Sequence, residues 1–168
     1  MLASILPFFT IPRLLLALAG FSAGMLGTAL IGQYGFNLHP CHLCILQRYP
    51  YAAIIALGLF GFFAIKNSKI QKYLLLACIV LLFVDGSIAF YHAGVELGIF
   101  PGPSGCTSSG KTGQTLEELR AEILGAPLVT CDQAMIHVLG LSMAAWNSIA
   151  AFGAGTATAF VFYKGQKK

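Results

Sequence analysis

Charged residues are scarce in this chain. They make up 10% of its 168 residues, whereas an average soluble domain carries about 25%. Hydrophobic residues make up 57%, and the mean hydropathy is +0.79. A soluble domain of this size leaves too much surface exposed to bury so many apolar side chains, and disordered chains have the opposite composition. The composition therefore excludes a water-soluble enzyme and a disordered protein, and it predicts an integral membrane protein.

The chain also lacks any stripe of basic residues, although its net charge is +4. Its longest basic cluster is Lys164, Lys167 and Lys168 near the C-terminal end. A nucleic-acid-binding surface needs basic side chains gathered along one face. We therefore expect a lipid bilayer, and no nucleic acid, as a partner of this chain.

Four apolar stretches are long enough to cross a bilayer, which takes about 20 residues. We predict an all-α bundle of four transmembrane helices in one domain (residues 1–168), with spans at about 14–31, 45–65, 73–90 and 143–163. The loops on one side of the membrane are then at about 32–44 and 91–142. Clusters of small residues at 20–24 and 153–155 predict places where two helices approach closely.

Basic side chains are distributed unevenly between the two sides of the predicted bundle. One side carries seven positive charges and no acidic residue: Arg13, Lys66, Lys69, Lys72, Lys164, Lys167 and Lys168. Cytoplasmic segments of membrane proteins carry an excess of Lys and Arg. We therefore expect both termini to be cytoplasmic and the two loops to face outward.

The second outward loop contains a sequence pattern that is typical of a short helix. Thr115 and Glu118 have the spacing of a capping box. Apolar residues follow at helical spacing, namely Leu116, Leu119, Ile123 and Leu124. This pattern predicts a short amphipathic helix lying on the membrane surface. A helix packed against the bundle is the alternative.

Four of the five cysteines fall on the outward side. Cys41 and Cys44 form a Cys-x-x-Cys motif where the second span begins, and Cys106 and Cys131 lie in the long loop. An even number of cysteines in an oxidising compartment suggests disulfides. The fifth, Cys78, lies within the third span, where a free cysteine usually serves as a small hydrophobic residue.

The same four cysteines could also have a structural role without redox activity. Two static disulfides would brace the loops, and a zinc ion bound by four thiolates is a second alternative. Such zinc sites often use two Cys-x-x-Cys motifs, and this chain has one, so we expect no metal. Attachment of a c-type haem needs His after the second cysteine, and Ile45 stands there.

The surroundings of Cys44 favour redox chemistry. Cys44 falls at the first turn of the second span, where unpaired backbone N–H groups stabilise an anion. Arg48 is four residues further on and so lies on the same helical face. Both effects lower the pKa of a thiol and make it a better leaving group. The alternative for Arg48 is a side chain that reaches the lipid headgroups.

Local motifs in this order resemble the DsbB family of disulfide bond formation proteins. The matching segments are residues 40–48 (PCHLCILQR), 91–96 (YHAGVE), 131–132 (CD) and 140–147 (GLSMAAWN). Vitamin K epoxide reductase-like proteins use similar chemistry, but their cysteine pairs come in a different order. That resemblance is therefore the second choice.

The DsbB resemblance implies a quinone-dependent thiol oxidase of the bacterial inner membrane, with its active site at the periplasmic face. It would reoxidise a thioredoxin-like DsbA-type oxidase and reduce ubiquinone or menaquinone. The partner would attack a Cys106–Cys131 disulfide at Cys106, and the freed Cys131 would attack Cys41. Cys44 would then be released as a thiolate and form a charge-transfer or covalent adduct with the quinone, stabilised by Arg48.

Three further residues are candidates near the quinone or the proton path. His92 lies at the outward end of the third span, and the resemblance makes it a hydrogen-bond donor to a quinone oxygen; an interfacial histidine is the alternative. Trp146 belongs either to the aromatic belt or to the quinone site. Asp85 lies inside the third span, where ionisable residues are functional candidates, and Arg48 or a proton path for quinone reduction would be its partner.

Overall fold

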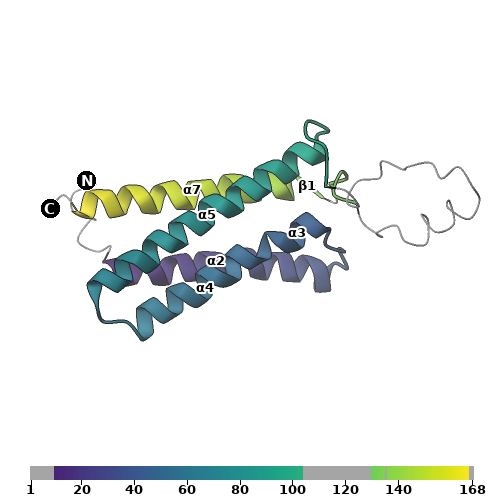
Figure 1. The fold of residues 1–168 in the computed structure, drawn as a ribbon. Coiled ribbons are helices and arrows are strands. Elements are labelled where there is room, and N and C mark those ends of the chain that lie inside the picture. The colour runs from purple at the N-terminus through teal and green to yellow at the C-terminus, as the bar shows by residue number, and fades with distance from the viewer. Residues whose placement is uncertain (1–9, 104–129, 135, 167–168) are drawn as a thin grey trace, which may run out of the picture.

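The computed structural model describes residues 10–103, 130–134 and 136–166. Its helices are α2 (Ile11–Gly35), α3 (His42–Leu46), α4 (Arg48–Phe63), α5 (Ser68–Glu96) and α7 (Met143–Gln166). Figure 1 shows the four long helices running lengthwise beside one another. Helix α2 packs on α4, α5 packs on α7, and α4 and α5 join the two pairs. Cys106 and the predicted amphipathic helix lie outside the described residues.

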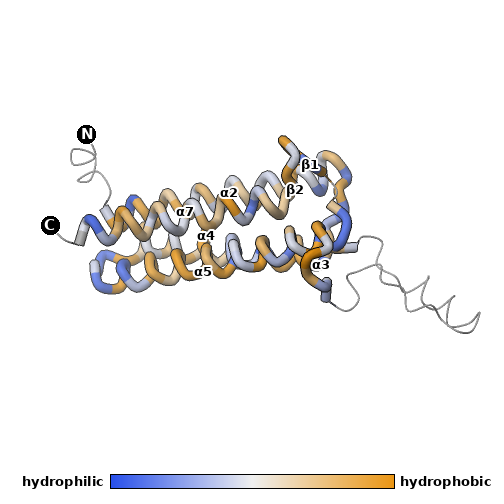
Figure 2. The backbone as a smooth tube through the Cα atoms, turned by 90° about the horizontal axis from the view of Figure 1, so that it is seen from above, coloured by the Kyte–Doolittle hydropathy of each residue, from blue (hydrophilic) through white to orange (hydrophobic). Residues whose placement is uncertain are grey.

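Three helical segments are long and apolar enough to cross a membrane. They are Ile11–Gly35, His42–Phe63 and Ser68–Glu96, and they confirm the prediction of a helical membrane protein. The fourth predicted span coincides with α7, whose apolar sequence is interrupted by polar residues such as Asn147 and Ser148. Figure 2 shows hydrophilic segments gathered toward the two ends of the bundle. The count of four spans stays a prediction.

The second apolar stretch is broken into two helices at its outward end. Helix α3 ends at Leu46, and α4 begins at Arg48 after the single residue Gln47. Pro50 explains the break, because it has no N–H to donate to the carbonyl of Leu46 and its ring crowds that carbonyl. The Cys-x-x-Cys motif therefore lies on a short helix of its own.

The closest helix approach occurs at glycines that the sequence analysis did not single out. A Cβ on Gly58 would lie 2.7 Å from the backbone oxygen of Leu15, so α2 contacts the backbone of α4 there. The expectation for the small-residue clusters is wrong at Gly20, Gly24 and Gly153, where an added Cβ would meet nothing within 4 Å. It is confirmed at Gly155, where an added Cβ would lie 3.4 Å from Phe83 of α5. Small residues permit close packing only on the face that meets a neighbouring helix.

A short hairpin precedes α7. Strand β1 (His137–Val138) pairs antiparallel with β2 (Leu141–Ser142), with His137 opposite Ser142. The turn residues Leu139 and Gly140 both have positive φ, 52° and 82°, as a two-residue hairpin turn requires. The indole Nε1 of Trp146 donates to the carbonyl of Val138 at 2.8 Å, which ties the hairpin to the first turn of α7.

Replacement of Gly58 by Ala should destabilise the bundle. The new methyl group would overlap backbone atoms of α2, which cannot move aside as a flexible side chain can. We expect the free energy of unfolding in detergent micelles to fall by about 1–3 kcal/mol. Gly20→Ala is the matched control, since its Cβ would enter open space, and it should leave stability unchanged or slightly higher. Equal stability of the two variants would contradict the packing described here.

Candidate active site

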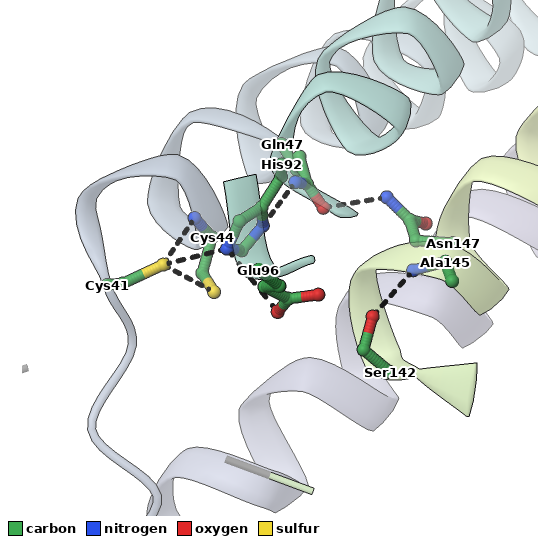
Figure 3. Close-up of polar contacts among 8 residues, drawn as sticks. All are labelled: Cys41, Cys44, Gln47, His92, Glu96, Ser142, Ala145 and Asn147. Carbon is green, nitrogen blue, oxygen red and sulfur yellow. Dashed lines mark hydrogen bonds and ion pairs between the residues drawn. The ribbon is translucent and has the colours of Figure 1, made fainter. Parts of the chain in front are cut away.

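Cys41 and Cys44 face each other at the start of α3. Cys41 is the N-cap of the helix, with extended backbone angles of φ −72° and ψ 172°. Its Sγ accepts a hydrogen bond from the backbone N–H of Cys44 at 3.3 Å and lies 2.9 Å from the Cys44 Sγ (Figure 3). Both cysteines are free thiols in this structure. Their sulfurs are thus close enough to form a disulfide with a small movement.

The geometry stabilises a negative charge on Cys41. The thiol of Cys44 lowers the pKa of Cys41 most, followed by His92 and by the backbone N–H of Cys44, although burial alone would raise it. We had expected the helix N-terminus and Arg48 to act on Cys44. The structure places the helix N–H group on the sulfur of Cys41 instead, because Cys41 occupies the N-cap position.

His92 connects the cysteine pair with α5. Its Nε2 lies 3.5 Å from the Sγ of Cys41 and 3.6 Å from Oε1 of Glu96. Both His92 and Glu96 have buried side chains, with 4% and 9% of their surface exposed. Figure 3 shows the imidazole between the two sulfurs and the Glu96 carboxylate. His92 is therefore positioned to exchange a proton with either group.

A chain of buried amides continues from His92 into the bundle. Nε2 of Gln47 lies 3.0 Å from Nδ1 of His92, and Oε1 of Gln47 accepts from Nδ2 of Asn147 at 2.9 Å. The same Asn147 amide donates to Oδ2 of Asp85 at 3.1 Å, and the hydroxyl of Tyr51 donates to Oδ1 of Asn147 at 2.6 Å. Side chains from α4, α5 and α7 thus meet in one polar network.

A cavity of about 430 Å³ opens beside the cysteines. Helices α2, α4, α5 and α7 contribute to its wall, and so do residues of the β hairpin. The four residues proposed from the sequence to bind a cofactor all line it, namely Cys44, Arg48, His92 and Trp146. Sequence positions up to about a hundred residues apart thereby converge on one space.

Two polar groups on the cavity wall have unused hydrogen-bonding capacity. Nη1 of Arg48 donates to Oε1 of Gln33 at 2.6 Å, but its buried Nε has no hydrogen-bond partner among the described residues. Oε2 of Glu96 is likewise buried and unpaired within the described part of the chain. Buried polar atoms are normally paired, so these two suggest a ligand that carries a donor or acceptor of its own.

Cys131 lies close to this region. It is disulfide-bonded, fully buried, and belongs to one small buried cluster with Cys41, Leu43 and Val95. Cys106, its predicted partner, lies outside the described residues. The four-thiolate zinc site weighed above would need Cys131 as a free thiolate, and in this structure Cys131 is bonded.

Comparison with known proteins shows the family of this chain. The family model described as "Disulfide bond formation protein DsbB" matches residues 12–161. The chain belongs to the DsbB family. Its relatives include Disulfide bond formation protein B of Cupriavidus metallidurans, which is 31% identical over 81% of each chain. Disulfide bond formation protein B 1 of Pseudomonas savastanoi pv. phaseolicola is 32% identical over 83% of this chain and 82% of its own. The uncharacterized protein RP370 of Rickettsia prowazekii is 29% identical over 79% and 76%.

Family membership confirms the resemblance stated from the motifs and supports a disulfide-forming oxidoreductase in a membrane. The sequence analysis missed Gln47, Glu96, Asn147 and Tyr51 as parts of the site. The sequence does indicate a functional role for Gln47, Glu96 and Asn147, since each is a polar residue in or beside an otherwise apolar stretch. Tyr51 gives no such signal, because tyrosine also fits an apolar core.

Removal of the His92 imidazole should make the Cys41 thiolate harder to form. A thiol with a lowered pKa is already ionised at neutral pH, so its alkylation rate stays level until the pH falls through the pKa. In His92→Ala we expect this fall to begin about one pH unit higher, which corresponds to about 1.4 kcal/mol. The measurement is alkylation of reduced protein, resolved for Cys41 by mass spectrometry.

His42→Ala is the control for that experiment. His42 is the residue next to Cys41 but is exposed, and its loss should leave the pH profile unchanged. A profile for His92→Ala that coincides with that of the parent would contradict the role of the imidazole.

Proposed function

We propose that this protein oxidises the dithiol of a periplasmic DsbA-type, thioredoxin-like oxidase and passes the electrons to a membrane quinone, ubiquinone or menaquinone. The observation that carries the proposal is the position of Cys44. It lies 2.9 Å from the Cys41 sulfur on one side and lines the 430 Å³ cavity on the other. A thiol pair on the wall of a cavity inside a membrane bundle is suited to join a soluble dithiol to a lipid-soluble acceptor.

The residues around the cavity fit a quinone headgroup. Apolar side chains make up most of the wall, including Met25, Leu26, Ile136 and Met143, and these suit a ring and an isoprenoid tail. The indole of Trp146 offers a face on which an aromatic ring can stack. The unpaired Nε of Arg48 offers a hydrogen bond to a carbonyl oxygen. A bound quinone would supply the two-electron acceptor, which no side chain can replace.

The cysteines would act in sequence on the dithiol. A thiolate of the partner attacks Cys106 in the predicted Cys106–Cys131 disulfide and forms a mixed disulfide. The released Cys131 thiolate attacks Cys41 in the Cys41–Cys44 disulfide, and Cys44 leaves as a thiolate that faces the cavity. The shared buried cluster of Cys41 and Cys131 supports this second step, since exchange needs the two sulfurs close together.

Electrons and protons balance over one cycle. The partner dithiol loses two electrons and two protons and becomes a disulfide, and the same number end on the quinone as it becomes a quinol. The second thiolate of the partner then displaces Cys106, which attacks Cys131 and forms the Cys106–Cys131 disulfide again. This releases Cys41, which forms its disulfide with Cys44 again as the electron pair passes to the quinone. The Arg48 guanidinium would hold the negative charge of Cys44 while its electrons leave, and His92 and Glu96 are positioned to move the protons.

The proposed location is the bacterial inner membrane, crossed four times, with the active site at the periplasmic face. The lysine-rich turn between α4 and α5 supports this orientation, because it lies at the end of the bundle opposite to α3 (Figure 1). Basic segments favour the cytoplasm, so α3 and the cavity would lie near the periplasm.

The alternatives have less support. Two static disulfides would not require a free Cys41–Cys44 pair beside a cavity with unpaired polar groups. A vitamin K epoxide reductase-like activity would use similar thiols, but the DsbB model covers residues 12–161.

Cys44→Ala should reduce quinone turnover to background. Purified protein is supplied with a reduced thioredoxin-like oxidase and a soluble ubiquinone analogue, and quinone loss is followed by absorbance. Cys78→Ala, which changes a buried cysteine in α5 outside the cavity wall, should retain turnover. Absence of turnover in the parent with matched partner and quinone would favour static disulfides.

Trp146 permits a binding test that does not depend on turnover. It is the only tryptophan of the chain and lines the cavity, so a quinone bound there should quench the intrinsic tryptophan fluorescence. In Arg48→Gln the dissociation constant should rise about tenfold, equal to about 1.4 kcal/mol. Arg13→Gln is the matched control, because Arg13 lies at the start of α2 and does not line the cavity. This variant should bind the quinone as the parent does. Equally tight quenching in both variants would show that Arg48 does not bind the quinone, and absence of quenching in the parent would place the quinone elsewhere.

A further inference from the structure

Asp85 is a fully buried carboxylate that the cysteine steps do not use. It lies on α5 two turns before His92 and has 0% of its surface exposed. Its Oδ2 accepts a hydrogen bond from Nδ2 of Asn147 at 3.1 Å, and its Oδ1 has no partner among the described residues. A carboxylate is costly to bury in an apolar bundle, which suggests that it performs a task.

The chemistry of Asp85 determines which way the neighbouring amides point. An ionised carboxylate can only accept hydrogen bonds, so Asn147 must present its amide nitrogen to Asp85. The Asn147 oxygen then faces Tyr51, whose hydroxyl donates to it at 2.6 Å. With Asn147 in this orientation, its nitrogen also donates to Oε1 of Gln47 at 2.9 Å.

The orientation of Gln47 in turn determines the tautomer of His92. Because Oε1 of Gln47 faces Asn147, its amide nitrogen faces Nδ1 of His92 at 3.0 Å (Figure 3). An amide nitrogen is a donor only, so Nδ1 must accept and the single proton of a neutral imidazole lies on Nε2. That nitrogen is 3.5 Å from the Cys41 sulfur. From Asn147 onward, the donors of Asn147, Gln47 and His92 therefore each face the next group on the way to Cys41.

We propose that Asp85 is a positioning residue that, through Asn147 and Gln47, holds His92 in the tautomer whose Nε2–H group faces the sulfur of Cys41. The proposal rests on the proposed function, in which the Cys41 sulfur must alternate between a disulfide and a thiolate. A donor facing that sulfur stabilises the thiolate, whereas a lone pair there would repel it.

Loss of the Asp85 carboxylate would permit the hydrogen bonds between position 85 and His92 to reverse their direction. In Asp85→Asn the new amide can donate to the Asn147 oxygen, after which both amides rotate and the Gln47 oxygen faces Nδ1 of His92. The imidazole proton then moves to Nδ1, and the lone pair of Nε2 faces Cys41. Of the titratable groups in the described residues, Cys44 and His92 face Cys41, Glu96 faces His92, and Tyr51 faces Asp85.

The direct test is the tautomer of His92 in the reduced, quinone-free protein. NMR of the full chain labelled with ¹⁵N-histidine separates protonated from unprotonated ring nitrogens, and His92→Ala assigns the signals. We expect the proton on Nε2 in the parent and on Nδ1 in Asp85→Asn. Residue-resolved alkylation should show the fall in Cys41 reactivity beginning about one pH unit higher in the variant. A parent protein with its proton on Nδ1 overturns the proposal, and this measurement needs no variant of Asp85.

Two further variants separate orientation from stability. The double variant Asp85→Asn with Asn147→Asp keeps the composition and one buried carboxylate. The carboxylate at position 147 can only accept, so Gln47 must donate to it, and the direction of the hydrogen bonds to His92 is reversed. We expect it to resemble Asp85→Asn, and restoration of the parent tautomer and alkylation profile would overturn the proposal. Tyr51→Phe removes a hydrogen bond from the same network without reversing it and should keep the parent tautomer. These readouts need no quinone, so they stand apart from the Cys44→Ala turnover test.

Discussion

Polar side chains inside this apolar bundle have to satisfy one another, because the hydrocarbon core of a membrane offers no water as a partner. The network that runs from Tyr51 and Asp85 through Asn147 and Gln47 to His92 meets that requirement. Its members come from α4, α5, α7 and the junction between α3 and α4, so these segments are held in one relative position. The same links place the imidazole beside Cys41, and the proposed redox pair of Cys41 and Cys44 therefore depends on the packing of the helices.

The break between α3 and α4 has an equally direct effect on the site. Pro50 ends the hydrogen-bonding pattern of α3 at Leu46, so the Cys-x-x-Cys motif begins a separate helix with Cys41 as its N-cap. The N-cap sulfur of Cys41 receives the backbone N–H of Cys44, and both cysteines line the cavity. The two cysteines still differ in their surroundings, because Cys41 is the N-cap and its sulfur lies 3.5 Å from Nε2 of His92, while Cys44 is the one proposed to pass electrons to the acceptor.

Glu96 and Arg48 show how the cavity combines apolar walls with a few polar atoms. Such a composition is usual for sites that bind a largely apolar ligand with one or two oriented polar groups. Their unpaired atoms, Oε2 and Nε, face no partner in the described chain, and each would be costly to leave unsatisfied. The quinone proposed above would have oxygens that can accept from Arg48 and, once reduced, hydroxyls that can donate to a carboxylate.

Composition and motif order were enough to predict a helical membrane protein of the DsbB family, because apolar length and cysteine spacing are properties of the chain itself. They also identified Cys44, Arg48, His92 and Trp146, which the structure brings to one cavity. Only the tertiary structure showed that Cys41 is the N-cap, that Gly58 rather than Gly20 is the close contact, and that Gln47 and Asn147 link Asp85 to His92. Those features depend on which face of each helix meets its neighbour, and helices that are apolar on all sides carry no periodic pattern that reveals it.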